Sequence, residues 1–166
     1  MKFNIITFLV FALTITNSWG NNFYSSQQAE RIAKIALKDK SISIKHEIAI
    51  SNTNKKPEDV LVYMCEREEG DDFYVVITQA KGRYELFDYL LAVNLDLEVE
   101  KVRVLKYRSE HGNEIASKKW LEQFVGYSSG ELKYKKDISA ISGATISAKS
   151  ITADIPVLIT ILRNNL

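Results

Sequence analysis

Small and hydroxyl-bearing residues dominate positions 139–152, "SAISGATISAKSIT". This stretch has no charge before Lys149, although 26% of the chain is charged. The word Ser-Gly-Ala-Thr at its centre ends in Thr145, whose hydroxyl can form an ester. Gly143 and Ala144 leave the backbone beside that hydroxyl narrow. The stretch is either a turn followed by a helix cap or a site of covalent attachment.

The segment after this word has the apolar spacing of a helix. Unpaired backbone N–H groups and the positive end of the dipole favour an anion at a helix start, and Ser142 and Ser147 can add hydroxyl donors. Pro156 predicts either a kink or a helix that starts near Thr152 or Asp154. The apolar positions are Ile151, Ile155, Leu158, Ile159 and Leu162.

Two further helices are expected upstream. Residues 25–40 place small and apolar residues on one face, and Ser25 with Gln28 fits a capping box. Residues 115–126 form a second amphipathic segment, which Gly126 ends just past the C-cap.

Four strand-like runs lie between these helices, and short connections between them favour antiparallel hairpins. We expect a β-meander with one face exposed to water. N-terminal and C-terminal helices packed on this sheet would give an α+β fold. The predicted strands are Asp59–Arg67, Phe73–Gly82, Arg83–Asn94 and Leu97–Arg108.

The N-terminus has the pattern of a secretory signal. Residues 1–20 contain a basic start, a short apolar run and the small residues Ser18 and Gly20. We therefore expect cleavage after residue 20, a single domain over residues 21–166 and a periplasmic location. The alternative is an uncleaved membrane anchor, for which the run is short.

Composition argues against several function classes. The net charge is +1, and acidic and basic residues are mixed along the chain, which disfavours nucleic-acid binding. No cluster of cysteine and histidine indicates a metal site: His46 and His111 are far apart, and Cys65 lies in an apolar run typical of a buried thiol.

The Ser-Gly-Ala-Thr stretch resembles the modification site of FMN-binding domains, in residues 139–147, "SAISGATIS". This family includes one component of the sodium-pumping NADH:quinone reductase, one component of the Rnf electron-transport complex, and stand-alone exported proteins. The similarity extends over about residues 74–162. It implies FMN joined through its phosphate to Thr145 by a flavin transferase. The family has an acidic residue where this chain has Ser139, with Asp137 two positions earlier; this departure concerns the efficiency of attachment.

The loop "SEHGNEI" corresponds to a flavin-side turn of the reductase members of the family. The resemblance therefore implies that Glu110, His111 and Gly112 lie near the flavin. From its residue type, His111 is equally compatible with a hydrogen bond to the ring and with a solvent-facing loop. Trp120 fits core packing better than flavin stacking, and Tyr84 fits sheet packing or the lining of the ring.

The resulting hypothesis is an exported flavoprotein that carries electrons between a membrane donor and a periplasmic or membrane acceptor. No paired carboxylates or nucleophile–base arrangement indicate a substrate site of its own. Two alternatives stay open: a flavin-dependent reductase of a small substrate, and a binding domain of the same fold without flavin.

Overall fold

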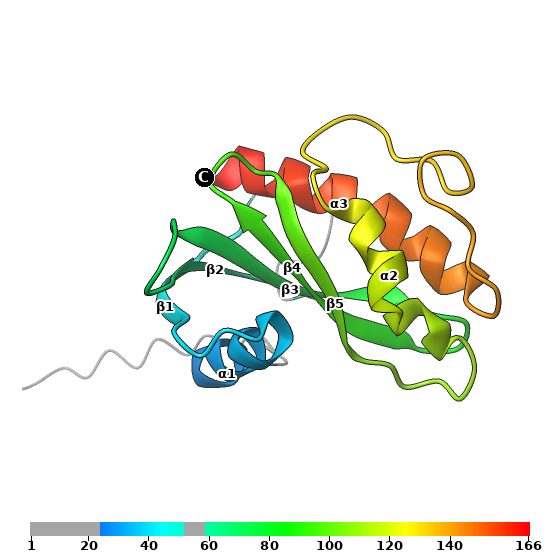
Figure 1. The fold of residues 1–166 in the computed structure, drawn as a ribbon, viewed down its shortest axis with the longest axis horizontal. Helices are drawn as coiled ribbons and strands as arrows, with labels where there is room; N and C mark the ends of the chain where they lie inside the picture. The colour runs from blue at the N-terminus through cyan, green and yellow to red at the C-terminus, as the bar shows by residue number, and fades with distance from the viewer. Residues whose placement is uncertain (1–23, 52–58) are drawn as a thin grey trace, which may run out of the picture.

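One antiparallel sheet forms the centre of the molecule (Figure 1). The structure is a computed structural model, and it describes residues 24–51 and 59–166. The strands follow one another in space in the same order as in the chain, as in a meander. The predicted α+β fold is confirmed, whereas the predicted signal peptide lies outside the described residues. The strands are β1 (Ser43–Ile48), β2 (Val60–Glu66), β3 (Phe73–Lys81), β4 (Leu86–Asn94) and β5 (Val99–Lys106).

Helix α1 (Ser26–Leu37) covers one face of the sheet. Its capping box forms as predicted: the Gln28 amide donates to Ser25 Oγ at 3.3 Å, and the Ser25 amide donates to Gln28 Oε1 at 2.8 Å. Ala29 and Ala33 are fully buried, and their small side chains let the helix lie close to the strands. The helix ends at Lys38, which is in the left-handed conformation.

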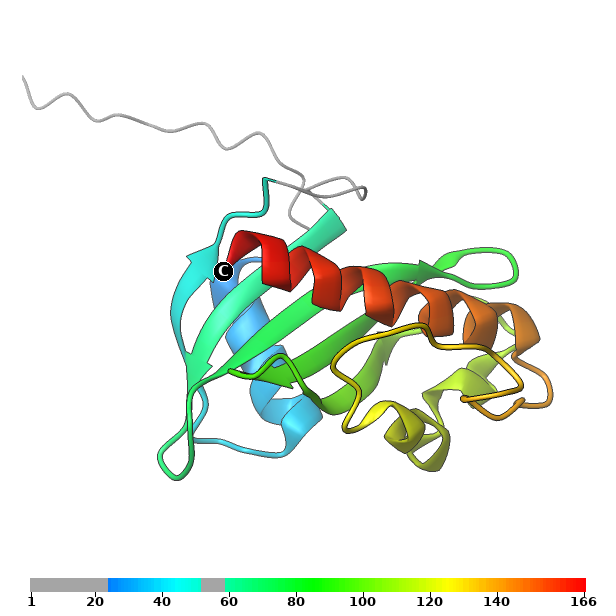
Figure 2. The same cartoon turned by 90° about the horizontal axis from the view of Figure 1, so that it is seen from above.

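Helix α3 (Thr145–Asn165) covers the opposite face, as Figure 2 shows. It runs uninterrupted through Pro156, so the predicted start near Thr152 or Asp154 is wrong. Burial of one side of the helix against the sheet outweighs the local cost of the proline. The helix is long and apolar enough to cross a membrane, but its apolar residues, among them Ile151 and Ile155, belong to the core.

The central strands are buried on both faces, so the predicted water-exposed face is wrong. In β3, every residue from Phe73 to Thr78 is buried, and in β4 every residue from Phe87 to Val93. Alternate residues of these strands belong to two separate cores, one under α1 and one under α3. The sheet is therefore the middle of three layers.

Residues 113–124 form three short pieces instead of the single helix predicted over 115–126. They are the 3₁₀ turn η2 (Asn113–Ala116), α2 (Lys118–Leu121) and the 3₁₀ turn η3 (Glu122–Phe124). Ser117 interrupts the segment by capping α2, since its hydroxyl accepts from the Trp120 amide. Gly126, with φ of +87°, ends the segment as expected.

Candidate functional site

The Ser-Gly-Ala-Thr word lies at the N-terminus of α3, and Thr145 is the first helical residue. The cap residue is Ala144, which makes no side-chain hydrogen bond to the helix, and the first turn contains no acidic residue. The first backbone N–H groups therefore lack a capping side chain, and they lie at the positive end of the helix dipole. Thr145 is exposed, whereas Ala144 and Ser147 are buried.

The hairpin turn between β3 and β4 brings a cation beside this helix start. Residues 82–85 form a turn, closed by a hydrogen bond of 2.9 Å from the Gly82 amide to the Glu85 carbonyl. The prediction that a strand begins at Arg83 is therefore wrong. Tyr84 is 69% exposed in this turn, so it does not pack on the sheet. The guanidinium carbon of Arg83 lies 5.2 Å from the centroid of the Tyr84 ring.

Tyr107 joins the loop at 109–112 to the first turn of α3. Its hydroxyl donates to the His111 carbonyl at 3.0 Å and lies 3.1 Å from Ser147 Oγ. Ser147 is 1% exposed, so this contact satisfies a buried hydroxyl. Two segments far apart in sequence are thus held together by one phenol.

Gly112 permits the close approach of this loop. Its φ is +97°, and a Cβ at this position would lie 2.3 Å from Tyr107 Oη. The same Cβ would lie 3.6 Å from the Gly143 carbonyl, so the loop passes directly over the Ser-Gly-Ala-Thr turn. A larger residue would be strained by its backbone and obstructed by the tyrosine.

Gly143 has the same role on the other side of the contact. Its φ is +81°, and a Cβ here would lie 2.7 Å from the carboxyl carbon of Glu114. The Glu114 carboxylate therefore packs against the turn, although it does not line the pocket described next.

A pocket of about 250 Å³ opens at this junction. The α3 N-terminus, the loop, Tyr107 just after β5 and the hairpin turn all contribute to it. Arg83 supplies the one charged side chain among the described residues that line it. Main-chain N–H groups, hydroxyls and one guanidinium are the donors that bind phosphate. The lining residues are Arg83, Tyr107, Gly112, Gly143, Ala144, Thr145, Ile146 and Ser147.

Site residues predicted from the sequence divide into two groups. Gly112, Gly143, Ala144, Thr145 and Ser147 meet in this pocket. Glu110, His111 and Ser142 are exposed or partly exposed beside it and do not line it; of these, His111 takes part through its main-chain carbonyl.

The position of the family's acidic residue is held in place by the segment around α2. The Trp120 indole donates to the Ser139 carbonyl at 2.8 Å, and the Ser139 amide donates to Gln123 Oε1 at 2.8 Å. Trp120 is 6% exposed and packs edge-on against Phe124, so it is a core residue. The Asp137 carboxylate closes its own turn by accepting from the Lys133 amide.

Three lining residues are not among the predicted site residues: Ile146, which directly follows Thr145, and Arg83 and Tyr107, which lie far from it in the sequence. Arg83 falls in a run that resembles a strand, and Tyr107 resembles one more apolar member of an alternating strand. Two sequence features could have indicated Arg83 and Tyr107. The Gly-Arg pair at 82–83 is typical of a turn, and Tyr107 lies next to the predicted flavin-side loop.

One family model matches the part of the chain that forms most of this pocket. Residues 86–156 match the model of the FMN-binding domain. The match extends from the start of β4 to the middle of α3, and so it covers all the lining residues except Arg83. No curated protein matches the chain.

Proposed function

We propose that this chain carries FMN covalently on Thr145. The match of residues 86–156 to the FMN-binding domain supports a flavin-binding protein. The observation that carries this proposal is the exposed Thr145 hydroxyl at the start of an uncapped helix, beside Arg83. These groups fit a phosphate ester, because the helix N-terminus and the guanidinium both offset its negative charge.

The pocket matches the phosphate end of FMN better than the whole cofactor. Its volume of about 250 Å³ is below the roughly 300–1,000 Å³ of sites that enclose a complete ligand. Ile146 lines the pocket and Tyr84 adjoins Arg83 in the hairpin turn; they are 45% and 69% exposed, so both are apolar groups that the ring could contact. A partly exposed ring suits exchange of electrons with another protein.

Each element of the site has a separate part in this proposal. Arg83 and the first N–H groups of α3 would hold the phosphate, and Ser147 fixes the position of Tyr107 at the pocket through the contact between their hydroxyls. Gly112 and Gly143 let the loop lie over the turn. When bound, FMN accepts and releases one or two electrons, and the surrounding protein tunes its potential.

A covalent bond also fits the proposed location outside the cytoplasm. There, a flavin that dissociates is diluted and lost, whereas a flavin joined through an ester does not dissociate. We propose that the protein is exported and passes electrons between a membrane donor and a periplasmic or membrane acceptor. The supporting observation is the signal pattern at residues 1–20. N-terminal sequencing of the cell-derived protein should begin near Asn21; an intact Met1 in a soluble cytosolic fraction would refute export.

Substitution of the acceptor tests the attachment site. Thr145→Ala should abolish covalent flavin, measured as fluorescence of the denatured band on a gel after coexpression with a flavin transferase. Thr160→Ala is the matched control, because Thr160 is an exposed threonine of the same helix whose hydroxyl donates to the Pro156 carbonyl. Flavin retained by Thr145→Ala, or mapped by peptide sequencing to Ser142 or Ser147, would contradict the assignment.

A further inference from the structure

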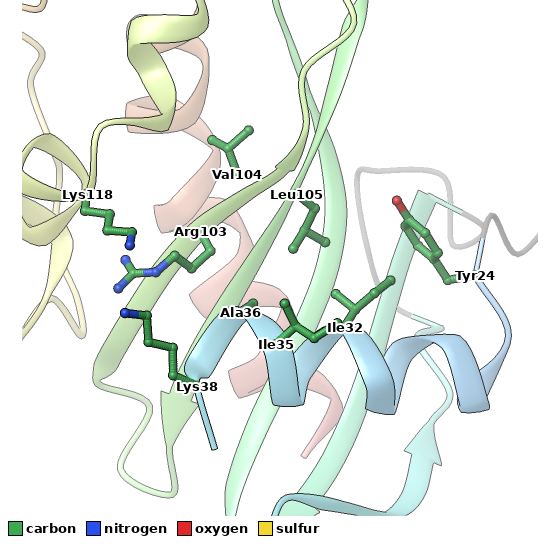
Figure 3. A pocket seen from close by; sticks show the side chains of 9 residues that line it. All are labelled: Tyr24, Ile32, Ile35, Ala36, Lys38, Arg103, Val104, Leu105 and Lys118. Carbon is green, nitrogen blue, oxygen red and sulfur yellow. The ribbon is translucent and has the colours of Figure 1, made fainter. Parts of the chain in front are cut away.

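A second pocket lies on the other side of the sheet, between α1 and β5 (Figure 3). Its volume is about 340 Å³, within the range of small-molecule sites. It is separate from the Thr145 pocket, with which it shares no lining residue among the described parts of the chain. Its lining residues are Tyr24, Ile32, Ile35, Ala36, Lys38, Arg103, Val104, Leu105 and Lys118.

One end of this pocket is strongly cationic. Figure 3 shows the charged groups of Lys38, Arg103 and Lys118 gathered there, although they come from three different segments of the chain. Within residues 24–51 and 59–166, no carboxylate forms an ion pair with any of the three. Like charges that converge repel one another, so an anion bound among them would stabilise the arrangement.

The remainder of the pocket is apolar and uncharged. Ile32, Ile35 and Ala36 of α1 and Leu105 of β5 lie between the cations and Tyr24, which is at the opposite end in Figure 3. Ile35 is 68% exposed, so its side chain is available to a ligand in this pocket. Burial, together with the hydrogen bond to Asp88, raises the pKa of Tyr24 to about 12, so this end is neutral at physiological pH.

We propose that this pocket binds a single-chain aliphatic carboxylate. The carboxylate lies among Lys38, Arg103 and Lys118, and the alkyl chain covers the apolar wall toward Tyr24. A small inorganic anion would leave that wall exposed to water, and an uncharged hydrocarbon would leave the three cations unneutralised. The polarity of the pocket therefore selects a molecule with a charged head and an apolar tail.

Three probes test this pairing by calorimetry on the purified protein, each used below the concentration at which it aggregates. Dodecanoate should bind, and its affinity should fall with added salt because the cations are accessible to solvent. Acetate has the head without the tail, and dodecanol has the tail without the charge; both should bind far more weakly. Equal affinity for dodecanol and dodecanoate would overturn the proposal.

Solvent-accessible side chains supply variants that leave the fold intact. Arg103→Gln/Lys118→Gln should weaken dodecanoate binding about five- to tenfold, since each exposed ion pair contributes modestly. The matched control is Lys40→Gln/Lys106→Gln, which removes the same charge at exposed positions outside the pocket. Lys38 is left unchanged because of its left-handed backbone. An equal loss of affinity in both double variants would reduce the effect to general electrostatics and overturn the site.

The apolar wall has its own pair of variants. Ile35→Gln should weaken binding of dodecanoate, whereas Val157→Gln, an exposed apolar residue of α3, should not. Two results would replace the proposal with another occupant. Sedimentation with anionic phospholipid vesicles, without binding of monomeric dodecanoate, would indicate a membrane surface. Self-association that is detected by analytical ultracentrifugation and abolished by Ile35→Gln would indicate a second copy of the chain. None of these measurements requires flavin, so their result is independent of the function of Thr145.

Discussion

At the scale of single residues, two glycines and one tyrosine hold the loop at 109–112 against the Ser-Gly-Ala-Thr turn. Gly112 and Gly143 both have positive φ, and a Cβ on either would lie closer than 3.0 Å to a neighbouring side chain. Tyr107 bonds both the loop and Ser147. The narrow backbone is therefore required by packing within the fold, in addition to any approach by a modifying enzyme.

Gly112→Ala should lower the free energy of unfolding by ~2–4 kcal/mol, because it adds a steric clash with Tyr107 Oη to the cost of a positive φ. The matched control is Gly130→Ala: Gly130 has nearly the same φ, +96°, and a Cβ there would meet no atom within 4 Å, so this substitution should cost ~1 kcal/mol. Urea unfolding of unmodified protein measures both.

A double variant isolates the clash. Tyr107→Phe removes the hydroxyl that a Cβ on Gly112 would meet, so Gly112→Ala/Tyr107→Phe should be more stable than the sum of the two single effects predicts. Equal losses for Gly112→Ala and Gly130→Ala would show that the loop moves away freely, and would contradict the tight contact.

The motif itself can be recognised from the sequence, whereas its partners cannot. The family resemblance rests on the types of the residues next to Thr145 in the sequence, so it needs no knowledge of the fold. Arg83 and Tyr107 reach the pocket through the pairing of β3, β4 and β5, and a hairpin register is not visible in a single sequence. The loop at 109–112 is predicted to lie near the site, but only Gly112 of its three named residues lines the pocket.

At the scale of elements, a buried carboxylate ties together the ends of the strands that lead into the site. Asp88 is 1% exposed and accepts two hydrogen bonds from Arg108, at 2.7 and 2.8 Å. It also accepts from Gln79 on β3 and from Tyr24 before α1. Arg108 lies just after β5, so this cluster fixes the start of the loop that Gly112 closes.

The pH dependence of stability follows from this cluster. Burial alone would raise the pKa of Asp88, but the hydrogen bonds from Arg108, Gln79 and Tyr24 outweigh burial and lower it. Because the pKa of Asp88 is lower in the folded state, the ionised cluster stabilises the protein at pH values above the pKa of an aspartate in the unfolded chain, about 3.9. This stabilisation is lost as the pH falls through the folded pKa.

Asp88→Asn should therefore cost ~2–3 kcal/mol at neutral pH, because it leaves Arg108 without its charge partner. The difference from the natural protein should shrink as the pH falls below about 4. Thermal unfolding across this range measures it, with Asp71→Asn, at an exposed position, as the control. A difference that stays constant down to the acid limit would rule out the proposed ionised state.

The predictions of sheet burial, of the edge strand and of the segment at 113–124 fail for separate physical reasons. The run Phe73–Ile77 is continuously apolar, which is the pattern of a strand buried on both faces, yet the hairpin connections suggest a water-exposed face. Edge strand β1 is missed because its side chains are exposed or half-buried and its alternation is weak. The segment at 113–124 follows helical spacing, but Ser117 divides it by capping α2.

At the scale of the whole molecule, the three layers separate two kinds of surface. The α3 layer carries the Thr145 pocket with its arginine, and the α1 layer carries the apolar pocket with its cluster of three cations. The central strands of the sheet between them are buried on both faces, so the two pockets lie on opposite sides of one core layer. The proposed FMN site on one face therefore leaves the opposite face available for the second ligand that we propose.

The central claim is that this chain carries one FMN as an ester on Thr145, and the intact mass of the protein recovered from its natural export route tests it most directly. The expected mass is that of the chain from about residue 21, increased by one FMN less one water, with the addition on the peptide that contains Thr145. An unmodified mass in cells that possess an active flavin transferase would contradict the claim and leave a flavin-free binding domain.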